Sequence, residues 1–556
     1  MRVRGGTGRV FIGIMVFAMG DVAAQPVGSM IPTPDVSDSW PGLAGGSARP
    51  GSVMAPPPRA DVRRWAAATD ETGSPIAFIP QAGLASANAS FGNFVFAVGR
   101  VSRPGGPMNQ SRLFAFVRST GACAWSAPLA SIGLDSISSP AVDHQRGTVI
   151  IASAAQLQAF DAVAGTHAWT TDLARPVVNA CPAIMPEGMG RDRLFITDFD
   201  GYGDSASLYC INIDPYDTVN NPFLPGEVVW QTPIGGSSGN SPAYLPRSLG
   251  GVGLVYVASV GAFGEQPGRV WAFDAEAVTP PEPTWVFENI IPAGFFGGVG
   301  LVRPEAPGRP PRVLAASYVF SGGLNAANLV KLDGVTGALA WSVPCNRTIS
   351  TPIVLPGGRI LVSGGIQGFG TVPSLRLYQD HDDHAVVLWD SALATWIDLN
   401  LNGVLDVGEY LRLGGWTQQP AVLSFAGRSI IASGVVPLGQ FNQPSSDLYF
   451  LDADLSPATS AFIVGHHSGA GGSPAPAGIA IYSVGTAGLV ALGPTPASLD
   501  VNADAACTID DLYAWEDATV PGDVDGDGAR TPADRAALLA TFRCLHAAPI
   551  APGGGP

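Results

Sequence analysis

Along most of the chain, apolar and polar residues alternate with a period of two, in short runs separated by turn residues. Residues 157–161 show this alternation, which is typical of a β-strand. Asp161 ends the run and Gly165 follows, which favours a tight turn because Asp caps it and glycine tolerates a positive φ. The next run carries Trp169, and two further runs lie upstream. The pattern predicts a unit of four short antiparallel strands.

The same hairpin signature, Ala-x-Asp-x-x-Thr-Gly-x-x-x-Trp, returns along the chain with few substitutions. A hairpin that recurs roughly every 40–60 residues indicates a stacked or radial repeat fold. One unit cannot bury both of its faces, whereas stacking units around an axis does so and leaves only short edges. Three copies are clearest. The first contains Ala159, Asp161, Ala164, Gly165 and Trp169, and the second contains Asp333, Thr336, Gly337 and Trp341. In the third, Val117 stands at the Asp position and is followed by Thr120, Gly121 and Trp125.

The last unit of the array supplies three strands, and no Trp-bearing strand follows residues 489–492. We expect residues 62–66, with Trp65, to provide the missing strand from the N-terminal side and so close the ring. The sequence therefore predicts a mainly β fold, a β-propeller of about eight blades over residues 61–495. Seven blades is the alternative, because the first unit after Gly73 is irregular.

The repeat resembles the PQQ-like, or quinoprotein-type, propeller repeat. This resemblance implies that each repeat Trp packs between neighbouring blades. Quinoprotein dehydrogenases hold PQQ on the propeller axis, many with a disulfide between adjacent cysteines, a bridging calcium and a catalytic Asp. This chain has no adjacent Cys pair and no motif onto which the catalytic Asp maps. The sequence therefore disfavours PQQ as a cofactor. Whether the chain is an enzyme stays open, and the sequence favours a protein without catalytic activity.

The N-terminal residues resemble a secretory signal peptide over residues 1–24. Arg2, Arg4 and Arg9 precede an apolar run at 10–19, and cleavage is expected near Ala24. We therefore expect a secreted, periplasmic or extracellular protein. Residues 25–60, rich in Pro, Gly and Ser, predict a flexible linker, and residues 549–556 a disordered tail.

The formal net charge of −16 disfavours nucleic acid and anionic membranes as partners. No further apolar segment is long enough to predict a membrane span. Six cysteines in an exported protein suggest disulfides, but their pairing stays open. Cys181 and Cys210 fall on one predicted blade, Cys507 and Cys544 bracket the C-terminal segment, and Cys123 and Cys345 are candidates for free thiols.

An EF-type calcium loop is predicted in an insertion near residues 396–412, between two blades. Side-chain oxygens recur at the spacing that calcium loops use, Gly403 provides the sharp turn, and the last position closes the site with a carboxylate. The expected ligands are Asp398, Asn400, Asn402, the backbone carbonyl of Val404, Asp406 and Glu409.

Two similar loops lie in tandem at residues 496–548, each followed by a short helical run. Asp rather than Glu at the twelfth position resembles a dockerin module, a small α-helical domain, which implies calcium-dependent folding and a cohesin partner on a scaffold or cell surface. Ala505 replaces the usual glycine in the first loop. The expected ligands are Asp500, Asn502, Asp504, Ala506, Thr508 and Asp511 in the first loop, and Asp523, Asp525, Asp527, Ala529, Thr531 and Asp534 in the second.

These features favour a secreted, non-catalytic propeller that binds protein or glycan and is tethered through the dockerin-like module. One alternative is a secreted polysaccharide-acting enzyme that carries a dockerin, and another is a PQQ-dependent oxidoreductase. The compact cluster around His381 and His384 is interpreted as a solvated turn rather than a transition-metal site. The H-E-x-x-H motif of zinc hydrolases does not occur in the sequence.

Overall fold

The computed structural model divides the chain into two units, Met1–Asp35 and Val36–Pro556, and every residue described below belongs to the second. The predicted signal peptide and its cleavage position lie outside the described residues. The structure describes residues 39–54, 62–79, 82–130, 138–188, 190–201, 203–261, 267–304, 306, 308–368, 370–425, 427–437, 445–478, 480–493 and 509–516, together with 524, 530, 532, 534, 535, 538 and 539.

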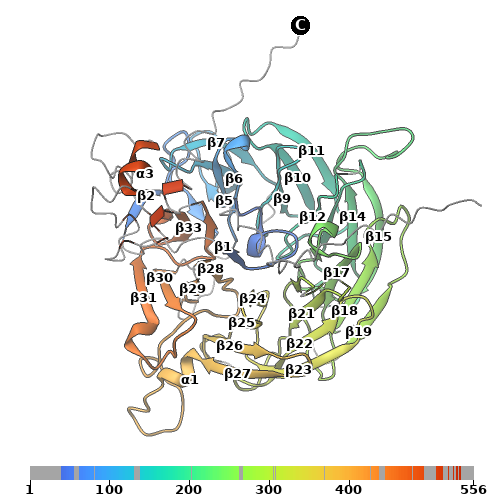
Figure 1. Ribbon diagram of the computed structural model, residues 1–556. Helices are drawn as coiled ribbons and strands as arrows, with labels where there is room; N and C mark the ends of the chain where they lie inside the picture. The colour runs from blue at the N-terminus through green and yellow to red at the C-terminus, as the bar shows by residue number, and fades with distance from the viewer. Residues whose placement is uncertain are drawn as a thin grey trace, which may run out of the picture. The chain divides into compact units, whose positions relative to one another are not determined.

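Eight sheets, each with four principal antiparallel strands, form the blades of a β-propeller, as Figure 1 shows. The inner strands of successive blades contact one another, and β32 (Ala475–Ala477) of blade 8 contacts β4 (Ala85–Ser86) of blade 1. The ring is therefore closed. The predicted mainly β propeller is confirmed, with eight blades rather than seven.

The first four blades follow one another along the chain. Blade 1 is irregular, as expected, because two short strands pair with β5. The strands are β3 (Ala77–Phe78), β4, β5 (Phe94–Val101), β6 (Gln110–Val117) and β7 (Cys123–Pro128); β8 (Ala141–Asp143), β9 (Thr148–Ser153), β10 (Gln156–Asp161) and β11 (His167–Asp172); β12 (Ala183–Met185), β13 (Arg193–Thr197), β14 (Ala206–Asn212) and β15 (Val228–Gly235); and β16 (Ala243–Tyr244), β17 (Leu254–Ser259), β18 (Arg269–Asp274) and β19 (Trp285–Glu288).

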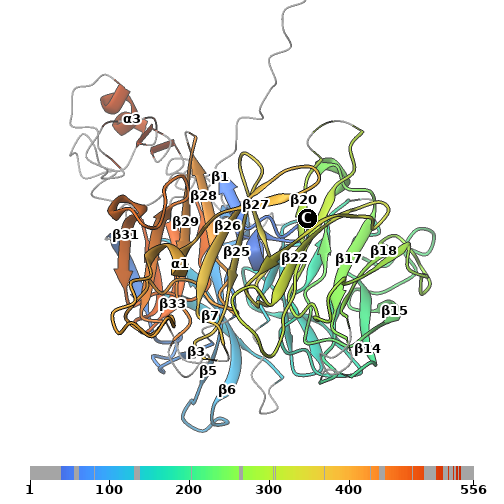
Figure 2. The ribbon, with the colours of Figure 1, turned by 90° about the horizontal axis from the view of Figure 1, so that it is seen from below.

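Blades 5 to 8 complete the ring, and Figure 2 shows their strands running between the two ends of the axis. They are β20 (Gly300–Val302), β21 (Arg312–Ala316), β22 (Ala327–Asp333) and β23 (Leu339–Cys345); β24 (Ile353–Leu355), β25 (Arg359–Gly364), β26 (Ser374–Asp380) and β27 (Ala385–Asp390); β28 (Ala421–Phe425), β29 (Arg428–Ser433), β30 (Asp447–Asp452) and β31 (Ile463–Ser468); and β32, β33 (Ala480–Gly485), β34 (Gly488–Leu492) and β2 (Arg63–Ala67).

Helices are few among the described residues, and none of them is long and apolar enough to cross a membrane. The α-helices are α1 (Ser391–Thr395) and α3 (Ile509–Glu516). Short 3₁₀ turns are η1 (Leu43–Gly45), η2 (Ala89–Phe91), η3 (Arg247–Leu249) and η5 (Ser460–Phe462).

The repeat signature joins each blade to the next. Gly165 has a φ of 68°, and a Cβ on it would lie 2.5 Å from the Trp125 indole of the preceding blade. Gly337 stands in the same relation to Trp285, whose indole N–H also donates to the Gly334 carbonyl at 3.2 Å. Glycine is therefore required both by its backbone conformation and by the close approach of the indole. The repeat Trp packs between blades.

The ring is closed at its outer edge by β2, which pairs antiparallel with β34. Trp65 lies opposite Ala491 and donates its indole N–H to the Arg118 carbonyl of blade 1 at 2.8 Å. A Cβ on Gly121 would lie 2.5 Å from the same indole. The N-terminal strand thus completes blade 8 and docks it on blade 1, as the sequence predicts.

Residues 39–54 differ from the flexible linker that their composition predicts, because they follow the inside of the ring. Trp40 bridges to Ser86 in blade 1, and the Ser47 carbonyl accepts from the Tyr244 N–H in blade 4 at 2.9 Å. The segment ends as β1 (Ser52–Met54), which pairs parallel with β28 in blade 7. Its small Gly, Ser, Ala and Pro residues fit the narrow space between inner strands. The blades, rather than the segment itself, supply the apolar surface that buries it.

Arg49 anchors this axial segment. The side chain is buried and donates to the carbonyl oxygens of Leu43, Cys181, Pro182 and Pro242 at 2.9–3.3 Å. Burial lowers the pKa of Arg49 to about 10, so the guanidinium stays charged at neutral pH. One side chain therefore joins η1 to the entries of blades 3 and 4.

Four cysteines lie within the described part of the chain, and all four are free thiols. Cys181 and Cys210 do share blade 3, but they form no disulfide. Burial raises the pKa of Cys345 to about 12, which keeps that thiol protonated and unreactive. Cys507 and Cys544 lie outside the described residues.

Candidate functional site

The loops that lead from the outer strand of one blade to the inner strand of the next meet at one end of the propeller axis. We call this end the axial face, and define it by residues 236–242, 289–299, 346–352, 413–420 and 469–474. A small cavity of about 40 Å³ opens there, lined among others by Asn179, Ser241, Phe296, Thr417, Gln419 and Ser473. Its described lining residues include no carboxylate, histidine or lysine.

Four aromatic side chains pack together beside this cavity, and we call Phe296, Tyr318, Phe320 and Trp416 the aromatic cluster. The ring centroids of Phe296 and Tyr318 are 4.8 Å apart, and those of Tyr318 and Trp416 are 5.5 Å apart. Phe320 meets both Phe296 and Tyr318 edge-on. These are favourable aromatic geometries. Phe320 is nevertheless 51% exposed, so the cluster offers an open aromatic surface beside the cavity.

Buried Arg347 fixes the loop that carries Phe320. Its guanidinium donates to the carbonyl oxygens of Phe320 at 2.7 Å and Gly322 at 2.9 Å, and lies 5.8 Å from the centre of the Tyr318 ring. Burial raises the pKa of Tyr318, although Arg347 opposes the shift, so the phenol stays neutral. The loop is therefore held in place before any ligand arrives.

Neutral amides and hydroxyls surround the cavity and connect its loops. The Asn240 amide donates to the carbonyls of Phe295 at 2.5 Å and Gly297 at 3.1 Å, and Ser350 Oγ donates to the Gln418 carbonyl at 2.6 Å. The hydroxyls of Thr351 and Thr417 have no hydrogen-bond partner among the described atoms. A buried hydroxyl without a partner is costly. Of the two, Thr417 lines the cavity, so its hydroxyl can meet a polar ligand or water there.

The residues at this face do not fit a buried PQQ. Ligand cavities usually measure about 300–1,000 Å³, whereas this cavity measures about 40 Å³. PQQ also carries three carboxylates, and the cation nearest the cluster, Arg347, already donates to two carbonyls.

The opposite end of the axis contains a larger cavity of about 220 Å³, and the axial segment forms one wall. Pro41, Ala48 and Pro50 line it from that side, and Asp143 and Arg303 from the blades. Prolines and side chains of opposite charge line this cavity, and its described lining residues do not direct several polar groups towards one point.

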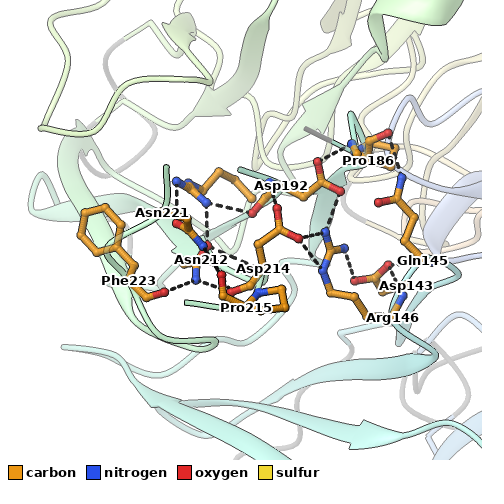
Figure 3. Close-up of polar contacts among 12 residues, drawn as sticks. Asp143, Gln145, Arg146, Pro186, Asp192, Asn212, Asp214, Pro215, Asn221 and Phe223 are labelled. Atoms are coloured by element: carbon orange, nitrogen blue, oxygen red, sulfur yellow. Dashed lines mark hydrogen bonds and ion pairs between the residues drawn. The ribbon is translucent and has the colours of Figure 1, made fainter. Parts of the chain in front are cut away.

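A buried ion network near that end joins blades 2 and 3 (Figure 3). Arg146 contacts the carboxylates of Asp143 and Asp192 at 2.7 Å and also that of Asp214. Burial opposes the charged form of Arg146, but the three carboxylates raise its pKa. Burial also raises the pKa of Asp192, despite the bonds from Arg146 and the Gly188 N–H. The charged groups of this network bond to one another, so the network joins blades 2 and 3 and has a structural role.

The predicted EF-type loop lies between α1 and β28, with its polar side chains turned inward. Asp398 accepts from the Gly403 N–H at 2.9 Å, and Asp406 accepts from the Asn400 and Asn402 amides at 2.8 and 2.7 Å. Glu409 is buried and accepts from the Leu399 N–H at 3.0 Å. The structure thus brings five of the six expected ligands together. No cluster of three or more His, Cys, Asp or Glu with metal-site geometry occurs in the described part of the chain, this loop included.

The two C-terminal loops lie almost wholly outside the described residues. Asp511 belongs to α3, and Asp534 is buried and accepts from the Val524 N–H. Arg530 lies over the Trp515 ring at 4.3 Å, and Arg535 pairs with Glu516 at 2.7 Å.

His381 and His384 stack face to face, 4.5 Å apart, in the exposed turn between β26 and β27. His384 contacts Asp383 at 2.7 Å. No third ligand joins them among the described side chains.

Comparison with known proteins shows the fold alone. No protein-family model matches the chain, and no curated protein matches it in sequence. A europium-containing methanol dehydrogenase aligns with a TM-score of 0.51 and 12% identity, over 90% of this chain and 96% of that one. BamB from Moraxella catarrhalis gives 0.42 and 15% identity, over 70% and 92%. Saccharomyces cerevisiae Sqt1 gives 0.45 and 11% identity, over 79% and 99%.

Sequence reasoning missed the aromatic cluster. Its four members come from separate loops, so no local spacing connects them. One signal was available: Trp416 and Phe320 fall outside the repeat positions at which aromatic residues pack between blades. An aromatic residue left over by the repeat is therefore a candidate for surface function.

Proposed function

We propose that this chain is a non-catalytic binding propeller whose axial face holds a neutral, polyhydroxylated ligand, of which a glycan is the leading class. The observation that carries this proposal is the aromatic cluster, open at Phe320, next to uncharged amides and hydroxyls. The C–H faces of sugar rings stack on aromatic surfaces, while sugar hydroxyls bond to amides. Glycoside hydrolysis needs a pair of carboxylates, and the described residues that line the cavity include none.

Neutral hexasaccharides of β-1,4-glucan, β-1,4-xylan, β-1,4-mannan and α-1,4-glucan, titrated calorimetrically, test the proposal. Phe320→Ala should weaken binding at least about tenfold, a loss of about 1.4 kcal/mol. Tyr216→Ala is the matched control, because Tyr216 is 52% exposed but lies away from the cluster. Equal losses in both variants, or no binding to any hexasaccharide, would refute the glycan assignment. Release of reducing ends would instead support the polysaccharide-acting alternative.

We also propose that the 398–409 loop binds calcium and that residues 496–548 form a dockerin-like tether for a cohesin-like protein of an extracellular scaffold. The inward-facing oxygens of Asp398, Asp406 and Glu409 support the first part, and the sequence resemblance supports the second.

Calcium titrated into the chelator-treated full-length protein separates these two parts. Glu409→Gln should remove one binding event, Asp523→Asn together with Asp525→Asn should remove another, and Glu276→Gln on an exposed ion pair should remove none. A Glu409→Gln titration identical to that of the unaltered protein would refute the insertion as a calcium site.

A further inference from the structure

Exposed aliphatic side chains concentrate in one stretch of the chain. The described residues include 24 large apolar side chains that are exposed to solvent, and nine of these lie between residues 386 and 407. Scattered exposed leucines and valines need no explanation, but a contiguous group of this kind usually marks an interface. Figure 1 shows α1 and the loop after it projecting outward from the ring between blades 6 and 7.

The polar side chains of the insertion bond to one another, and its aliphatic side chains project into solvent. Its base is anchored, since the Ile397 N–H donates to the Glu409 carbonyl at 2.8 Å and Trp396 packs against buried Val372 and Tyr410. The apolar side chains that alternate with the loop's polar ones are 50–87% exposed. They are Ile397, Leu399, Leu401, Val404 and Val407.

The neighbouring strand β27 has the same character. It is the last strand of its sheet, and among the described residues it pairs only with β26. Exposed edge strands usually carry charged residues that prevent further pairing. Here Val386, Val387 and Leu388 are instead 46–48% exposed. We call these three residues and the five aliphatic residues of the insertion the rim patch.

The charge around the rim patch identifies the kind of partner that fits. Residues 381–411 contain six carboxylates and no Lys or Arg. Two of the six are paired with arginines of other segments, Asp382 with Arg309 at 3.7 Å and Asp390 with Arg376 at 2.9 Å, so the carboxylates are still in excess. The first basic residue beyond, Arg412, donates to the Val436 carbonyl at 2.7 Å. A second copy of this patch or an anionic bilayer would be repelled, whereas a segment with Lys or Arg beside its apolar side chains would be attracted.

We infer that the rim patch docks an extended segment of another protein, apolar on one face and basic on the other, which adds as a strand to the open edge of β27. Backbone hydrogen bonds to the edge would give affinity, while aliphatic contacts and the basic residues would give selectivity. This surface is separate from the axial face, and the inference does not depend on a glycan. Asp398, Asp406 and Glu409 are also the proposed calcium ligands, so the attraction of basic residues should be strongest in the calcium-free protein.

Fluorescence anisotropy with two labelled decapeptides, alternating Val-Lys and alternating Val-Glu, tests the inference on the full-length protein. The Val-Lys peptide should bind at least about tenfold more tightly than the Val-Glu peptide. Leu399→Ser combined with Leu401→Ser should abolish this difference, and Val387→Lys should weaken Val-Lys binding. Val163→Ser combined with Val219→Ser is the matched control, because these residues are exposed elsewhere, and it should bind like the unaltered protein.

Equal affinity for the two peptides, no binding of either, or full binding by the Leu399→Ser/Leu401→Ser variant would overturn the inference. Sedimentation velocity adds an independent check. A dimer that the double variant dissociates would make the rim patch a self-interface and refute a basic partner. Unchanged melting temperatures of the variants establish that folding is intact, as expected for substitutions at exposed positions.

Discussion

Two nearby N-terminal stretches close this propeller in different ways. Residues 63–67 add a strand at the outer edge of blade 8, while residues 39–54 follow the inner strands from blade 1 to blade 7. The outer stretch carries a repeat Trp and was predicted. The inner one is rich in Gly, Ser and Pro, which predicted a linker. Whether a segment is buried therefore depends on the space between the inner strands as well as on the hydrophobicity of the segment itself.

Trp65→Ala should have the largest effect on the outer closure. The substitution removes a buried indole and its bond to the Arg118 carbonyl, so the free energy of unfolding should fall by about 3–5 kcal/mol. Urea denaturation measures this loss. A change below about 1 kcal/mol would mean that blade 8 holds without its N-terminal strand.

Arg49→Met tests the inner closure. The variant leaves several buried carbonyls without a donor, and we expect a loss of about 3 kcal/mol, with a smaller loss for Arg49→Lys, which retains a donor. The same denaturation series measures both. If Arg49→Met is as stable as the unaltered protein, the axial segment contributes nothing to closure.

Gly121→Ala sharpens the account of docking between blades, and the chain offers a closely matched control. Gly121 and Gly105 have φ values of 73° and 75°, but a Cβ on Gly121 meets Trp65 at 2.5 Å whereas one on Gly105 meets nothing within 4 Å. Gly105→Ala should cost about 1 kcal/mol from backbone conformation alone, and Gly121→Ala about 2–3 kcal/mol because the indole must also shift. Equal thermal shifts would contradict the proposed contact.

Asp70 gives the smallest expected effect and links β2 to blade 1 through Arg103. Burial opposes ionisation, but hydrogen bonds from Thr72, Arg103 and backbone N–H groups lower the Asp70 pKa from 3.8 to about 2. Because the folded pKa is depressed, this stabilisation is present above pH 4 and is lost as the pH falls towards 2. Asp70→Asn should remove about 1–2 kcal/mol at pH 7 and much less at pH 2. A loss that is independent of pH would contradict the ionic role.

The features that could be predicted from the sequence are those that depend on residues close together within one repeat. The turn around Asp333 and Gly337 and the packing of Trp285 and Trp341 follow from local spacing, and so does the closure by Trp65. The course of residues 39–54 could not be predicted, because their partners are inner strands up to several hundred positions away. The aromatic cluster was missed for the same reason. Phe296, Tyr318 and Trp416 meet only once the blades bring their loops to one end of the axis.

The EF-type loop could be predicted in part. Its oxygen spacing is local, so the convergence of Asp398, Asp406 and Glu409 followed from the sequence. The exposure of the aliphatic side chains in the same loop could not be predicted, because their sequence pattern alone does not say whether another element covers them.

Hydrogen exchange followed by mass spectrometry, with and without the hexasaccharide that binds most tightly, tests whether the axial face is the binding site. We expect bound ligand to slow exchange in residues 317–326 and 413–420, which carry Phe320 and Trp416, and we expect Phe320→Ala to remove this protection. Protection confined to residues 143–147 and 246–249, at the opposite end of the axis, would contradict the axial face as the binding site.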